Sequence, residues 1–208
     1  YLEKYASEGN GLTESTMKGR KFMRRKVEEY LRSTGRLNIA MLEVDLDFCR
    51  GFINFLRTAK NRRLKSEERT ISNCTGLQTQ AVFTAALNTA LRDGIIERNP
   101  MTLLTSKERF HQQESTRVYL TIDELKRMMA TPCDDGELKK AFLFACFTGL
   151  RLSDIRTFTW NKVLTTPNDS ARYIRVRMLK TQQVVNVPLS KDALGYLRET
   201  EDGDEPIF

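Results

Sequence analysis

The chain has 208 residues, of which 40% are hydrophobic and 29% charged, a composition typical of one or two globular domains and not of a disordered protein. No apolar run approaches the ~18 residues of a membrane span, and neither a secretion signal nor a zinc-site spacing is present, so we expect a cytoplasmic protein without membrane or metal. The net charge of +7 lies wholly in residues 1–118, where 21 Lys and Arg face 14 Asp and Glu, which indicates a polyanion-binding module or, alternatively, a solvated basic surface.

The first half of the sequence predicts a compact four-helix unit over residues 12–102, preceded over residues 1–11 by a flexible tail or the end of an upstream linker. Apolar residues recur there at helical spacing, and typical capping residues precede each run. The recognisable helices run from Thr13 to Gly35, from Asp45 to Leu56, and from Ser72 or Thr75 to Arg92. An Asn99-Pro100 break ends the unit.

Residues 103–118 are polar and lack periodicity, which predicts a linker between domains. Residues 119–208 begin with helical spacing and then change to alternation of apolar and polar residues. The expected elements are helices over Thr121–Met129 and Glu137–Thr148, a short helix capped by Ser153, strands around Ile174–Met178 and Val184–Val187, and a helix after Ser190. The second half is therefore a mainly helical α+β domain with a small antiparallel hairpin.

The segment Thr148–Ile155 carries the strongest chemical signal. An apolar helix stops at Gly149, and Arg151 follows directly before another helix. An unpaired buried guanidinium is very costly, so this arginine must meet a carboxylate or a bound anion. On composition alone, an ion pair between Arg151 and Asp154 is the favoured explanation.

The same segment resembles the first arginine motif of the tyrosine recombinase (phage-type integrase) family, T-G-(L/M)-R-x-(S/G)-(D/E)-(I/L). Lys180 resembles the hairpin lysine that follows this motif, and Val185–Ser190 resembles the strand after it. Thr75–Pro100 is similar to the third and fourth helices of the family's core-binding domain. The resemblance covers nearly the whole chain from Thr13 and is closest to integrases of bacterial mobile elements.

The resemblance implies a SAM-like four-helix core-binding domain, a catalytic domain, and a site-specific recombinase that integrates or excises a mobile genetic element. Such enzymes use no metal or nucleotide cofactor, because a tyrosine attacks the scissile phosphate and forms a 3′-phosphotyrosyl bond. Arg151 would hold the phosphate oxygens, Lys180 on a mobile turn would protonate the departing 5′-oxygen, and Asp154 would orient Arg151. The expected partners are double-stranded DNA, further protomers on paired recombination sites and, optionally, accessory DNA-bending proteins.

The sequence departs from the family pattern in its later motifs. The family's H-x-x-R has no counterpart, since the single histidine, His111, precedes Arg151, and none of the six tyrosines has a matching context. We therefore expect a fragment of the catalytic domain that binds DNA without cleaving it. Alternatives are a non-catalytic DNA-binding regulator or architectural protein on the same scaffold, a helical protein-interaction module, and a type IB topoisomerase.

Candidate DNA contacts lie in the first half of the chain. Cations can neutralise phosphates, and polar residues where the third helix begins can reach groove edges. A single lysine or arginine is more often a solvated side chain, whereas the cluster as a whole favours DNA binding. The cations are Lys18, Arg20, Lys21, Arg24, Lys60, Arg62, Arg63 and Lys65. The polar residues are Thr75, Gln78, Thr79 and Gln80.

Overall fold

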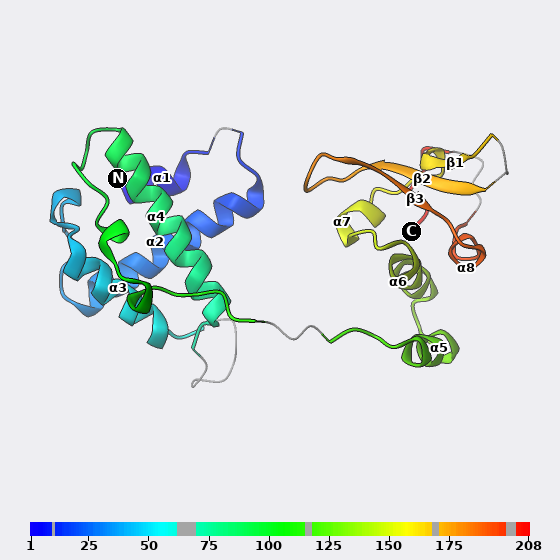
Figure 1. The fold of residues 1–208 in the computed structure, drawn as a ribbon, viewed down its shortest axis with the longest axis horizontal. Coiled ribbons are helices and arrows are strands. Elements are labelled where there is room, and N and C mark those ends of the chain that lie inside the picture. Colours follow the sequence, from blue (N-terminus) through cyan, green and yellow to red (C-terminus); the bar gives the residue numbers. More distant parts are fainter. Residues whose placement is uncertain (10, 62–69, 115–117, 168–170, 199–202) are drawn as a thin grey trace. The chain divides into compact units, whose positions relative to one another are not determined.

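A computed structural model describes residues 1–9, 11–61, 70–114, 118–167, 171–198 and 203–208. The chain forms two compact units, Tyr1–Arg117 and Val118–Phe208 (Figure 1). The first is helical and the second combines helices with a small antiparallel sheet, which confirms the predicted fold class. Within the described ranges, no helix has the length and apolar character needed to cross a membrane.

The first unit is built from helices α1 (Leu2–Ser7), α2 (Glu14–Ser33), α3 (Leu46–Thr58) and α4 (Asn73–Arg92). The predicted N-cap Asp45 is confirmed, because its side chain accepts a hydrogen bond from a backbone N–H in the first turn of α3. Thr13 and Ser72 cap α2 and α4 in the same way, so Ser72 and not Thr75 precedes α4. Phe52 of α3 and Phe83 of α4 are fully buried, and their ring centroids lie 4.9 Å apart at the centre of the core.

The flexible tail predicted over residues 1–11 is wrong for Leu2–Ser7, which form α1. Ala6 is buried, and the Arg20 guanidinium donates to the carbonyls of Tyr5 and Glu8, at 3.0 Å each, and stacks over the Tyr5 ring. Within the first unit, the described residues after Asn99 form only two 3₁₀ turns, Pro100–Leu103 and Ser106–Glu108, so the fourth helix of the unit is this N-terminal one.

The polar linker predicted over residues 103–118 is wrong for its first part. Leu104 and Phe110 are buried in the core of the first unit, and a 3₁₀ turn forms at Ser106–Glu108. The backbone N–H of Phe110 donates to the Gln80 side chain at 2.8 Å, which holds this segment against α4. The two buried anchors stand six residues apart in a largely polar stretch, so the stretch shows no periodicity.

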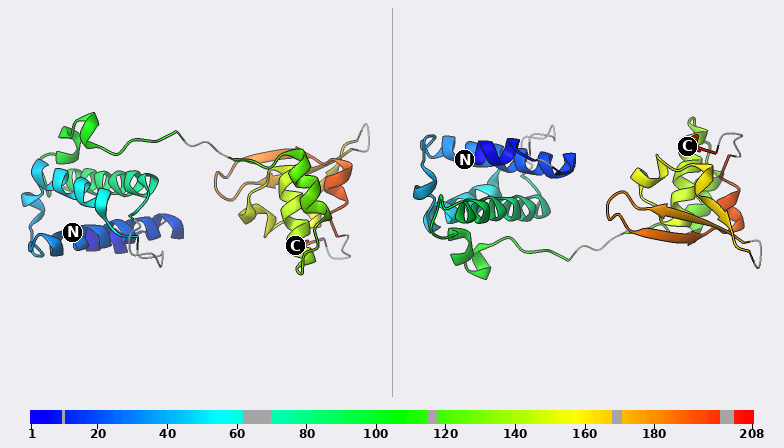
Figure 2. Two further views of the ribbon diagram at one scale, coloured as in Figure 1. Left: turned by 90° about the horizontal axis from the view of Figure 1, so that it is seen from below. Right: turned by 90° about the horizontal axis from the view of Figure 1, so that it is seen from above.

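The second unit contains helices α5 (Ile122–Ala130), α6 (Gly136–Thr148), α7 (Leu152–Ile155) and α8 (Lys191–Leu194) and strands β1 (Val163–Thr165), β2 (Arg172–Arg177) and β3 (Val184–Pro188). The strands pair antiparallel in the order β1-β2-β3, with Val176 opposite Val185. The apolar face of the sheet packs on α6 and α8 (Figures 1 and 2), where Ile174 and Phe144 are fully buried. Strand β1 was not predicted from the sequence.

Candidate functional site

The corner between α6 and α7 directs Arg151 into solvent. Gly149 adopts the left-handed conformation (φ 67°) that ends α6, and its N–H donates to the Ala145 carbonyl. The following Leu150 is buried in the core, whereas Arg151 is exposed and precedes the first turn of α7. The prediction that Ser153 caps this helix is wrong, because Arg151 takes the N-cap position without a side-chain bond.

Asp154 of α7 is 4% exposed and bonds the β2–β3 turn. Its Oδ1 accepts the backbone N–H of Leu179 at 2.9 Å, and its Oδ2 is buried without a hydrogen-bond partner among the residues that the structure describes. The Arg151–Asp154 ion pair favoured on composition is absent from the described residues, so that expectation is wrong. The carboxylate holds the hairpin instead of the arginine.

This single bond brings the two predicted catalytic side chains into one neighbourhood, where α7 and the β2–β3 turn lie side by side (Figures 1 and 2). Arg151 stands one helical turn before Asp154, and Lys180 directly follows Leu179. Bond lengths and helix geometry then limit the distance between the Cα atoms of Arg151 and Lys180 to about 17 Å. Both side chains are exposed, so their long stems can turn toward a common ligand.

A groove in the first unit collects several of the predicted DNA contacts. It has a volume of about 420 Å³ and lies between α2 and α4. Lys18 lines it from α2, and Thr75, Gln78 and Thr79 line it from α4. Lys18 also pairs with Glu14 at 2.7 Å, but both side chains are largely exposed, so the pair can open at little cost.

Four predicted DNA contacts are engaged within the protein. Arg20 holds α1, as described above, and Arg24 lies 3.6 Å from the Glu3 carboxylate. Thr79 and Gln80 are buried, and the hydroxyl of Thr79 donates to the Thr75 carbonyl. These hydrogen bonds and this burial make Arg20, Thr79 and Gln80 less available to DNA than predicted, whereas the Arg24 side chain remains 40% exposed, and its role as a DNA contact stays a prediction.

Of the other predicted cations, Lys21 and Lys60 are exposed. Arg62, Arg63 and Lys65 lie outside the described residues.

Lys26 is a charged residue that the sequence reasoning did not assign. It is 2% exposed, and its Nζ donates to Glu29 Oε2 at 2.8 Å and to the Lys60 carbonyl at 3.1 Å. The sequence pattern could have shown that Lys26 is buried, because this residue falls between Met23 and Val27 on the apolar face of its helix. This buried pair anchors the end of α3 to α2.

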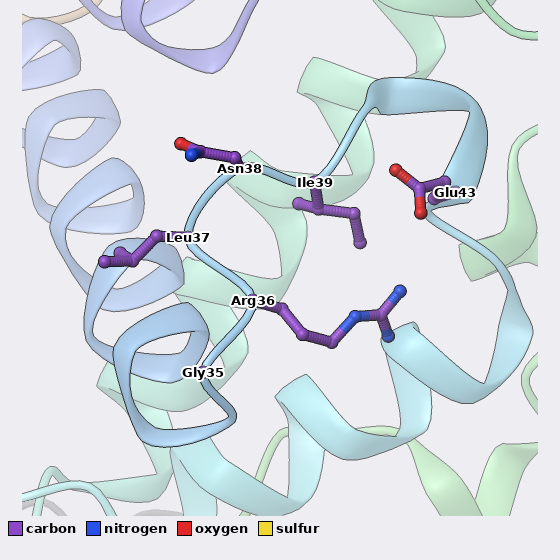
Figure 3. A pocket seen from close by; sticks show the side chains of 6 residues that line it. All are labelled: Gly35, Arg36, Leu37, Asn38, Ile39 and Glu43. Atoms are coloured by element: carbon purple, nitrogen blue, oxygen red, sulfur yellow. The ribbon is translucent and has the colours of Figure 1, made fainter.

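A further hollow, shown in Figure 3, lies in the loop after α2 and is lined by Gly35, Arg36, Leu37, Asn38, Ile39 and Glu43. The Glu43 carboxylate accepts the backbone N–H of Ala40 at 2.8 Å and so stabilises the loop. None of the predicted site residues lines this hollow, and we assign no function to it.

Two family models together match almost the whole chain. Residues 1–110 match the phage integrase SAM-like domain, and residues 118–206 match the phage integrase family. The chain belongs to the phage integrase family. The match of the SAM-like domain begins at residue 1, so it includes α1.

Solved integrase structures share the fold at low sequence identity. The Tn1549 transposon integrase in complex with circular intermediate DNA is 18% identical, with a TM-score of 0.64 over 94% of this chain and 61% of that one. The lambda integrase tetramer bound to a Holliday junction is 21% identical, with a TM-score of 0.62 over 93% of this chain and 52% of that one. The chain thus spans about three fifths or less of these integrases. Comparison with curated proteins gave no match.

Proposed function

We propose that this integrase chain serves site-specific DNA recombination, in which duplex DNA is cut and rejoined through a 3′-phosphotyrosyl bond to integrate or excise a mobile element. The observation that carries the proposal is the bond from Asp154 to the Leu179 N–H, which joins the Arg151 helix to the Lys180 turn. Arg151 and Lys180 are exposed cations on opposite sides of this bond, and no ion pair of the described residues uses either of them. They are therefore free to bind one phosphate.

The proposed chemistry assigns a separate task to each cation. When a tyrosine oxygen attacks phosphorus, the bond from phosphorus to the 5′-oxygen breaks, and negative charge builds on the non-bridging oxygens. The Arg151 guanidinium binds two of these oxygens in its planar fork and keeps its charge throughout. The Lys180 ammonium gives its proton to the departing 5′-oxygen, which an arginine cannot do. Asp154 acts indirectly, by holding the turn that carries Lys180.

The DNA-binding surface of the first unit is proposed to be the groove between α2 and α4. Lys18, Lys21 and Lys60 are exposed cations for phosphates, and Gln78 and Thr75 are accessible polar side chains on α4. An exposed glutamine amide can bond adenine at two atoms in the major groove, so Gln78 is the candidate for base recognition. Further protomers on paired sites, and accessory DNA-bending proteins, complete the proposed assembly.

The test begins by selecting a preferred duplex from a random pool with the 208-residue chain. Each phosphate of the selected site is then replaced singly by a neutral methylphosphonate, and Kd is measured by fluorescence anisotropy. One phosphate should depend on both Arg151 and Lys180, so that Arg151→Ala weakens binding at least tenfold and lowers the salt-dependence slope by about 0.9. Binding at the methylphosphonate version of that site should be insensitive to the same change.

Arg156→Ala is the matched control, because Arg156 is an exposed arginine at the other end of α7. A duplex nicked beside the cleavage position should form no covalent adduct with the 208 residues, since none of their tyrosines has the context of the nucleophile. Sequence-selective binding in which Arg151→Ala and Arg156→Ala behave alike would contradict the recombinase proposal and favour a DNA-binding regulator.

A further inference from the structure

The turn between β2 and β3 contains a strained residue, Gln182. Its φ of 58° is the only positive φ of a non-glycine residue in the described ranges. The left-handed conformation costs free energy for a residue with a Cβ and is more common for glycine or asparagine. A glutamine in this position therefore suggests that its side chain contributes something that glycine cannot supply.

The side chain of Gln182 supplies a hydrogen bond across the turn. Its Nε2 donates to the Leu179 carbonyl at 2.9 Å. The N–H of the same Leu179 donates to Asp154 at 2.9 Å, so side chains from two elements hold both backbone polar groups of the residue before Lys180. Leu179 itself is half exposed, so apolar packing does less to hold the turn than it would for a buried side chain.

The backbone of Gln182 is held as well. Its N–H donates to the Met178 carbonyl at 2.8 Å, and its carbonyl accepts a hydrogen bond from Arg177 Nη1 at 3.2 Å. Leu179 and Gln182 flank Lys180 and Thr181, and both of these middle residues are exposed. Hydrogen bonds thus hold the backbone on both sides of Lys180 and Thr181.

We propose that Gln182 is a positioning residue, which holds the backbone of the Lys180 turn in one conformation so that the ammonium group meets the phosphate bound by Arg151. Arg177 assists by bonding the Gln182 carbonyl. The proposal rests on the proposed function of Lys180. It adds that the unfavourable backbone conformation of Gln182 is offset by the hydrogen bond from its side chain to the Leu179 carbonyl.

The test compares Gln182→Asn with Gln183→Asn in the 208-residue chain. Asparagine tolerates the left-handed conformation but is too short to keep the bond to Leu179, whereas Gln183 is an exposed neighbour of the same type with no side-chain bond in the described residues. The first readout is amide hydrogen exchange by NMR without DNA. Exchange at Leu179 and at position 182 should become about tenfold faster in Gln182→Asn and stay unchanged in Gln183→Asn. Unchanged exchange in Gln182→Asn would overturn the proposal.

The second readout is Kd for the selected duplex, with and without a methylphosphonate at the phosphate that depends on Lys180. Gln182→Asn should weaken binding about tenfold in the presence of Lys180 and have no further effect in Lys180→Ala. Equal losses in both backgrounds would refute the positioning role. If Lys180→Ala changes binding at no phosphate while exchange is still faster in Gln182→Asn, the proposed function fails, and the bracing of the turn by Gln182 stands.

Discussion

Replacing Lys26 by methionine should destabilise the first unit by about 3 kcal/mol. Methionine keeps the apolar stem of the lysine but removes the ammonium group that donates to the Glu29 carboxylate and to the Lys60 carbonyl. Removing one member of a buried ion pair costs roughly 3–5 kcal/mol. We take the lower end, because the Glu29 side chain is 18% exposed and retains some hydration.

The loss of stability can be assigned to the first unit, because two spectroscopic signals report on the two units separately. Its single tryptophan, Trp160, lies in the second unit, so tryptophan fluorescence follows the unfolding of that unit alone. Circular dichroism at 222 nm follows mainly the long helices of the first unit. With a urea dependence of about 1.5 kcal/mol per M, Lys26→Met should lower the dichroism midpoint by about 2 M and leave the fluorescence midpoint unchanged.

Two further variants make the interpretation specific. Lys21→Met makes the same substitution at an exposed position of α2 and should change stability by less than about 0.5 kcal/mol. The double variant Lys26→Met with Glu29→Met should recover most of the loss, because an apolar pair of similar volume can replace a buried ion pair. A dichroism midpoint within about 0.5 M of the wild type would refute the assignment of Lys26 as a buried anchor, as would an equal shift of both midpoints.

Two other predictions concern the first unit. Burial raises the pKa of the Cys49 thiol to about 12, so at pH 8 iodoacetamide should modify only the three exposed cysteines of the folded chain, and mass spectrometry should detect a fourth adduct only in denaturant. A Cβ on Gly76 would come within 2.5 Å of the Phe110 ring. Gly76→Ala should therefore displace this ring, lower the free energy of unfolding by about 1–3 kcal/mol and accelerate proteolysis after Phe110. An unchanged dichroism midpoint would argue against this close packing.

Elements with local signals were predictable from the sequence. Thr13, Asp45, Thr121 and Ser190 begin helices because each side chain bonds a backbone N–H within the next three residues. Gly149 ends α6 because it takes up a positive φ without steric cost. The alternation of apolar and polar residues around Ile174 predicted β2, because this pattern is local and determines which face of the strand is buried. The same kind of pattern predicted its partner, β3.

Short elements held by distant contacts were not predictable. Helix α1 has six residues, too few to be stable alone, and it depends on the Arg20 bonds to Tyr5 and Glu8. Strand β1 has three residues and is defined by its pairing with β2. Arg20 was accordingly interpreted as a DNA contact, although its guanidinium is engaged within the protein.

The candidate site divides in the same way. The order of motifs along the chain was sufficient to single out Arg151, Asp154 and Lys180 and to predict the family, because residue identity and spacing are carried by the chain alone. The hydrogen-bond partner of Asp154 could not be predicted from the sequence. An acid three residues after an arginine can pair with that arginine as readily as with a distant backbone group. Folding the hairpin onto α7 put the Leu179 N–H within 2.9 Å of the carboxylate, and that packing settles the choice.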